Sequence, residues 1–296
     1  GPYSFIGGGC VNRACGACSF VGGGQANCAT GVFSGVASGN TNTASASGSF
    51  VAGGQQNSAT GNCSFIGGGY AHSANGTAST ISGGYTNTAG GNRSAVVGGR
   101  ANSASATYSM LGGGFGSTAS GYASFVGGGY NNCAAFSRST IVGGQLNLAN
   151  ATFTFIGGGC TNHACAGYAA VVGGWFNCSR GCASFIGAGS GNTASSCWAG
   201  AFGCNLSANQ PCHFFVNNLM SCGNITGSNA LITGTLTVQT IVAQTVTSST
   251  DFITGSTRFG SCLTNTHQFT GSVSITGSLT VNGPTMLNCG VCVNGD

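Results

Sequence analysis

Cysteines and histidines are the residues of this chain whose types and spacing could support chemistry. The 296 residues include 17 cysteines and four histidines. Two Cys-x-x-Cys pairs, "CGAC" from Cys15 to Cys18 and "CGVC" from Cys289 to Cys292, have the spacing of half a tetrahedral zinc site. Neither is followed by a second pair at zinc-finger distance, so neither predicts such a site.

Two further cysteine groupings gain meaning from a repeat described below. Cys160, His163 and Cys165 could be drawn as metal ligands, but neighbouring repeats carry other residues at these positions. We therefore expect no metal and no other cofactor. Cys182 and Cys197 share one repeat position in successive units, at a separation within disulfide range, and are the pair for which we predict a disulfide.

Catalytic groups and charges are scarce. Asp251 and Asp296 are the only acidic residues, so paired carboxylates cannot be built, and a Ser-His-Asp arrangement would need Asp251 with His213 or His267. Charged residues make up 3% of the chain, against about a quarter in soluble proteins. The sequence therefore predicts no enzyme and, lacking a basic patch, no nucleic-acid binding. No run of eighteen apolar residues occurs, so we also expect no membrane span.

A strict repeat positions all of these residues. Glycine recurs every fifteen residues, thirteen times from Gly9 to Gly189, and the next position in this series is Cys204. Asparagine falls three residues after most of these glycines and alanine two residues later. An aliphatic residue always precedes the glycine by three positions. The residues that define the pattern include Gly9, Gly24, Gly54 and Gly69, with Asn12, Asn27 and Asn57, and Phe5, Phe20, Phe50 and Phe65.

The short period predicts an all-β fold. Fifteen residues rich in glycine and β-branched side chains are too few for a helical hairpin but suit one coil of a parallel β-roll or β-solenoid. About fourteen coils stacked at the interstrand spacing make a rod roughly 65 Å long. The glycines would supply positive φ and close backbone approach, and the asparagines a ladder of amides that also tolerates left-handed backbone.

Neighbouring apolar residues in "SFIGGG" predict an oligomer. Neighbours on a strand point to opposite faces, so one residue lines the coil and the other faces outward. The sequence leaves open which of the two does so. An apolar column along the whole rod exceeds what a soluble monomer normally exposes, and cyclic symmetry would bury it in every chain.

The unit "SFIGGG…N.A" resembles the head repeats of YadA-like trimeric adhesins and the same repeats in bacteriophage tail fibres. The resemblance covers residues 1 to about 210, although the adhesin unit typically has fourteen residues. It implies a left-handed β-roll that packs as a homotrimer and acts in host attachment without catalysis. It also implies an extracellular or virion location, with partners that are a host-cell surface glycan or protein and other virion tail proteins.

The period ends after Asn209, and residues 211–296 read as strands broken by "TG" and "NG" turns. Segments such as "STRFG" and "THQFTGSVSITGSLTVNG" resemble the stalks of phage tail fibres. We therefore expect a β-roll domain over 1–210 and a strand-rich trimeric stalk over 211–296.

One repeat position carries aromatic residues directly after the recurring glycine. These are Tyr70, Tyr85, Phe115, Tyr130 and Trp175. Exposed aromatics could stack on sugar rings or bind a host surface, whereas the simpler interpretation is that they stack on one another and cover the turn. A head domain of a bacterial adhesin remains an alternative function. A monomeric ice-binding or surface-binding solenoid is another, suggested by "TNT" at Thr41 to Thr43 and Thr86 to Thr88, but the threonines recur irregularly.

Overall fold

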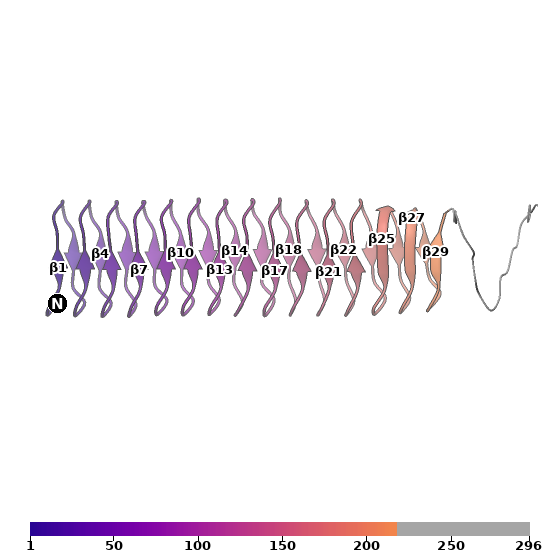
Figure 1. Ribbon diagram of the computed structural model, residues 1–296, viewed down its shortest axis with the longest axis horizontal. Helices are drawn as coiled ribbons and strands as arrows, with labels where there is room; N and C mark the ends of the chain where they lie inside the picture. The colour runs from indigo at the N-terminus through magenta and orange to yellow at the C-terminus, as the bar shows by residue number, and fades with distance from the viewer. Residues whose placement is uncertain (218–296) are drawn as a thin grey trace, which may run out of the picture. The chain divides into compact units, whose positions relative to one another are not determined.

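The computed structural model describes residues 1–217, and most of the predicted stalk lies outside them. Within residues 1–217 every regular element is a strand, and the strands form two parallel sheets that face each other along a straight stack of coils (Figure 1). Each coil contributes one strand to each sheet. This arrangement confirms the predicted all-β solenoid of about fourteen coils.

We name the two sheets after their buried residues. The aliphatic sheet has fifteen strands, in the order β1 (Phe5–Ile6), β3 (Phe20–Val21), β5 (Gly35–Val36), β7 (Phe50–Val51), β9 (Phe65–Ile66), β11 (Thr80–Ile81), β13 (Ala95–Val96), β15 (Met110–Leu111), β17 (Phe125–Val126), β19 (Thr140–Ile141), β21 (Phe155–Ile156), β23 (Ala170–Val171), β25 (Phe185–Ser190), β27 (Gly200–Cys204) and β29 (Phe214–Val216).

The alanine sheet has fourteen strands, in the order β2 (Arg13–Ala14), β4 (Cys28–Ala29), β6 (Thr43–Ala44), β8 (Ser58–Ala59), β10 (Ser73–Ala74), β12 (Thr88–Ala89), β14 (Ser103–Ala104), β16 (Thr118–Ala119), β18 (Cys133–Ala134), β20 (Leu148–Ala149), β22 (His163–Ala164), β24 (Cys178–Ser179), β26 (Thr193–Ala194) and β28 (Ser207–Ala208).

The core between the sheets is thin and uniform. From Val21 to Ile186, the aliphatic residue of each repeat is fully buried, and so is the residue opposite it, which is alanine except at Ser179; Ile66 and Ala74 illustrate the pair. The register pairs each residue with its copy one coil on, for example Ile66 with Ile81. The structure thereby settles which apolar neighbour lines the coil: the aliphatic residue faces inward and the phenylalanine faces out.

The asparagine ladder is present and satisfies three backbone groups in most coils. The amide nitrogen of Asn57 donates to the carbonyls of Gly53 and Gly69, both at 3.0 Å. Its side-chain oxygen accepts the backbone N–H of His72 in the next coil, also at 3.0 Å. Because these asparagines are buried, the ladder replaces the water that the turn carbonyls would otherwise need.

Positive φ occurs at the recurring glycines, as predicted, and also at two further positions in each coil. The recurring glycine does have positive φ, as at Gly144 (φ +91°). The asparagine, however, is not left-handed; the residue before it is, with φ of 54° at Leu146. A second left-handed position lies in the opposite turn, for example at Phe153 (φ 59°). Most of these positions hold residues other than glycine.

Hydrogen-bond direction explains the left-handed residues. Most backbone N–H groups donate to the following coil, as Arg13 does to Asn27 at 2.8 Å. The left-handed residues donate backward instead, as Ala26 does to Cys10 at 2.9 Å and Cys18 to Pro2 at 2.9 Å. Positive φ reverses the direction in which the backbone N–H of these residues points. Each turn is therefore hydrogen-bonded to the preceding coil as well as to the following one.

The period shortens near residue 200, which corrects two expectations. Phe185 pairs with Gly200, but after an irregularity at Gly187 the pairs Gly189–Gly203 and Ser190–Cys204 are fourteen residues apart. Gly203, and not Cys204, therefore continues the glycine series. The solenoid also continues beyond residue 210, because β29 (Phe214–Val216) pairs with β27.

Candidate functional site

An apolar face runs along the outside of the aliphatic sheet. We call it the outer aromatic face and define it by the first residue of each strand and the residue two positions later. Phe5, Phe20, Phe65, Phe155 and Phe185 on this face are between 39% and 57% exposed. No charged residue occupies either position on β1 to β23.

Side-chain volumes on the outer aromatic face compensate for one another. Most phenylalanines lie over a small residue two positions on; a Cβ added to Gly22 would lie 3.2 Å from the Phe20 ring. On three strands whose first residue is small, the second is a valine, as in the pairs Ala95 with Val97, Thr140 with Val142, and Ala170 with Val172. Because i and i+2 share one side of a strand, most coils contribute one large apolar side chain to the face, whereas β5 and β11 contribute none.

The predicted aromatic column forms a ladder along one turn edge. Tyr70 stacks on Tyr85 with ring centroids 4.9 Å apart, and Phe115 stacks on Tyr130 at 5.3 Å. Between these pairs, the Arg100 guanidinium lies 5.1 Å from the Tyr85 ring and 5.6 Å from the Phe115 ring. We call these five residues the first ladder.

Stacking within the first ladder limits what it can bind. The inner rings present their faces to one another, so a sugar ring can stack only at the two ends, on Tyr70 or Tyr130. Ring edges remain accessible, since Tyr85 and Tyr130 are 44% and 45% exposed. Trp175 lies beyond the ladder, contacts Phe176 edge to face at 4.7 Å and is 55% exposed. Mutual stacking thus accounts for four of the five predicted surface aromatics.

A second ladder follows the opposite turn, and the sequence analysis missed it. It comprises Arg93, Tyr108, Tyr122, Arg138, Phe153 and Tyr168. Arg138 lies between two of the rings, 5.9 Å from Tyr122 and 5.1 Å from Phe153, and Phe153 stacks on Tyr168 at 5.1 Å. The signal was available, because most members lie fifteen residues apart, starting at Arg93.

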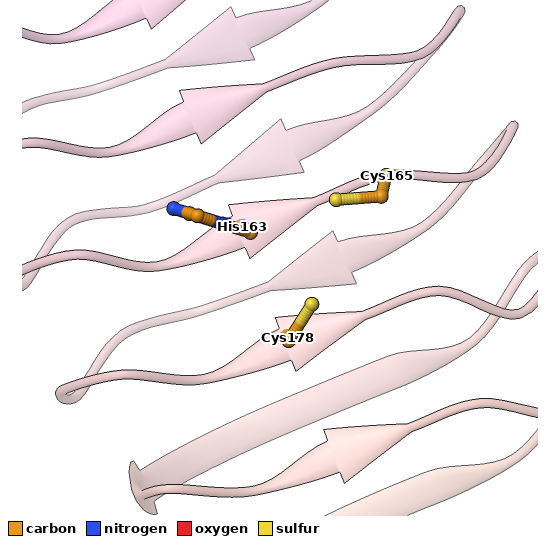
Figure 2. A group of neighbouring side chains, drawn as sticks. All are labelled: His163, Cys165 and Cys178. Carbon is orange, nitrogen blue, oxygen red and sulfur yellow. The ribbon is translucent and has the colours of Figure 1, made fainter.

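The cysteine and histidine candidates are placed differently from the sequence grouping. His163 and Cys165 lie together with Cys178 of the next coil (Figure 2), whereas Cys160 lies outside this group, in the turn beside Trp175. Cys182 and Cys197 are exposed, and both carry free thiols in the structure, as do Cys15 and Cys18. The disulfide predicted between Cys182 and Cys197 is therefore not formed in this structure and stays a prediction.

The threonine runs that suggested ice binding do not lie flat. Thr41 and Thr86 are left-handed turn residues (φ 56° and 50°), while Thr43 and Thr88 lie on strands of the alanine sheet. Each run is therefore divided between a turn and a strand.

Comparisons with known proteins add no assignment: no protein-family model matches the chain, and no curated protein matches it. Within residues 1–217, no helix has the length and apolar character needed to cross a membrane.

Proposed function

We propose that this chain is a structural and adhesive fibre protein, most simply a phage tail fibre or similar virion appendage that attaches to a host. In this proposal three chains pack through the outer aromatic face, and no catalysis is involved. The outer aromatic face carries the proposal. The resemblance of the repeat and of the second region to tail-fibre segments supports the choice of a virion fibre among trimeric rods.

The size and length of this face favour self-association. About a dozen side chains with roughly 40% of their surface exposed offer on the order of 900 Å² of apolar area, taking about 200 Å² for a whole aromatic side chain. A stable pairwise interface needs about 800 Å² from each partner, and a chain in a closed trimer contributes to two such interfaces, so the outer aromatic face would supply roughly half of the contact area. A long face on which apolar side chains recur on most coils fits a second straight rod better than a compact globular partner, and cyclic symmetry would cover it in every chain.

Recognition of the host would then fall to the two turn edges. Both ladders present exposed aromatic edges, and Trp175 offers an isolated indole. Aromatic edges flanked by hydroxyl and amide groups suit a surface glycan or protein. Other virion tail proteins would bind the ends of the fibre, outside the cell.

Two other functions remain open. A bacterial trimeric adhesin head would use the same repeats, and a coiled-coil stalk with a membrane anchor in the longer protein would distinguish it. A monomeric surface-binding solenoid is favoured by the uncharged hydroxyls that project from the alanine sheet, such as Thr43, Ser58 and Thr88.

The test is the native mass of the full chain, measured by light scattering at several concentrations. Three times the chain mass of 28.7 kDa is expected. A monomer at all concentrations would overturn the trimer and favour the single solenoid. A stable dimer would also contradict the proposed threefold packing.

A further inference from the structure

Three side chains able to ligate a metal meet on the outward face of the alanine sheet. His163 opens β22, Cys165 follows that strand directly, and Cys178 opens β24 in the next coil. The ring nitrogen and the two sulfurs all lie within 4.8 Å of one another. Figure 2 shows these side chains on two successive coils, with the Cys178 sulfur directed toward the coil that carries the other two.

The backbone sets this arrangement. His163 and Cys178 are direct partners in the parallel register, and Cys165 shares their face because it is two residues beyond His163. The Cys165 N–H donates to the Ser179 carbonyl at 2.8 Å, which ties the two coils together beside the group. Because the backbone positions are fixed in this way, the three side chains could approach a shared metal ion by rotation about their χ angles alone.

We propose that His163, Cys165 and Cys178 bind Zn²⁺ through three protein ligands and leave one position open to water. Zinc accepts imidazole nitrogen at about 2.0–2.1 Å and thiolate sulfur at about 2.3 Å in tetrahedral geometry. Those lengths place the ligand atoms roughly 3.5–4 Å apart, so a small closure of the group suffices. Among residues 1–217, His163, Cys165 and Cys178 form the one group in which three potential metal ligands lie close together.

A neighbouring arginine positions one of the proposed thiolate ligands. The Arg180 Nε–H donates to the Cys178 sulfur at 3.0 Å, a contact that favours the thiolate and orients it.

The chain contains its own comparison for this site. Arg13, Cys15 and Cys28 occupy the same three repeat positions in the first two coils, with arginine in place of the histidine. Other coils fill these positions with residues such as Thr43, Ser45 and Ser58. Serine substitutions at the proposed ligands are therefore compatible with the fold.

The test uses Co²⁺ as a spectroscopic probe for Zn²⁺ in the full, reduced chain. The chain is expected to bind one Co²⁺ more than the double variant Cys165→Ser/Cys178→Ser, with the absorption of tetrahedral, thiolate-bound cobalt. His163→Arg, which copies the arrangement of the first two coils, should weaken this binding at least tenfold. Zn²⁺ should displace the cobalt and raise the melting temperature of the native chain but not of the double variant.

The matched control is Cys15→Ser/Cys28→Ser, which removes two thiols at equivalent positions and should leave the tetrahedral signal unchanged. Equal cobalt stoichiometry and spectra in the native chain and the Cys165→Ser/Cys178→Ser variant would overturn the proposal. A Cys165–Cys178 disulfide that persists in reductant would overturn it as well.

Discussion

Single glycines differ sharply in what they contribute, and the adjacent Gly143 and Gly144 show the difference. Gly144 has φ +91°, and a Cβ there would overlap the Gly159 carbonyl oxygen and lie 2.7 Å from the Asn147 amide nitrogen. Gly143 has no other atom within 4 Å of an added Cβ. The recurring glycine is required for the close stacking of coils, while its neighbour is replaceable.

Gly144→Ala is accordingly expected to lower the free energy of unfolding by at least about 2 kcal/mol, from left-handed strain together with overlap. Gly143→Ala should change it by less than about 0.5 kcal/mol. Denaturant unfolding of both variants checks this, and similar losses in the two would contradict the assignment.

His72 interrupts the asparagine ladder with a titratable group. Its Nδ1 accepts the Asn87 N–H at 3.0 Å, but its buried Nε2 has no hydrogen-bond partner. Desolvation by burial lowers the pKa of the imidazole. Because the unfolded chain takes up a proton near pH 6.5 that the folded coil resists, stability is expected to fall as the pH drops below about 6.5.

His72→Asn should remove this part of the pH dependence and restore the amide bonds seen at Asn57, each worth about 1 kcal/mol. Melting temperatures between pH 5 and 8 measure both effects. His213→Asn, at an exposed position outside the core, is the control and should leave the acid sensitivity in place. Unchanged acid sensitivity in His72→Asn would show that another group is responsible.

Each coil, taken as an element, is closed by two left-handed turns, and some carry β-branched residues that this conformation disfavours. Thr86 has φ 50°, whereas other coils place Gly116 or Asn131 at the same position. The N–H of Thr86 donates backward to the Tyr70 carbonyl at 2.8 Å. The hydrogen bond that links the coils thus keeps threonine in an unfavourable backbone.

Thr86→Asn should therefore stabilise the chain by about 0.5–1 kcal/mol, since asparagine accepts left-handed backbone more readily. Thr88→Asn, two residues on in β12, is the matched control and should be neutral or slightly destabilising because asparagine is disfavoured in strands. Thermal unfolding compares the two. Stabilisation by Thr88→Asn alone would refute the backbone explanation.

For the molecule as a whole, stability depends on summed contacts between neighbouring coils, as in other solenoids. Both outward faces then remain free for association and binding. Charge is almost absent from the outer aromatic face, so a carboxylate placed there would have to be buried without a partner if the chain trimerises.

Phe125→Asp/Phe155→Asp is therefore expected to convert a trimer into monomers in light scattering. Phe153→Asp is the control: Phe153 is 40% exposed, close to the 39% of Phe155, but belongs to the second ladder at a turn edge. Its substitution should leave the native mass unchanged. A native mass that responds equally to both changes would place the interface elsewhere.

Much of this fold follows from the sequence alone, because a strict fifteen-residue period means that each coil stacks on its own copy. The glycine and asparagine positions could be assigned roles for the same reason, since a residue repeated at one height meets its copy above and below. The period likewise predicted an aromatic column at a turn.

Only the tertiary structure decided which side of each strand faces inward. The orientation of the strand about its own axis depends on the geometry of the turns at both of its ends, which the sequence does not give. The structure also showed that the residue before the asparagine, such as Leu146, has left-handed backbone. The structure also placed Cys178 beside His163 and Cys165 of the preceding coil. The sequence analysis grouped residues within one repeat and therefore did not include Cys178. Finally, the irregularity at Gly187 shifted the register so that Gly203 takes the place expected for Cys204.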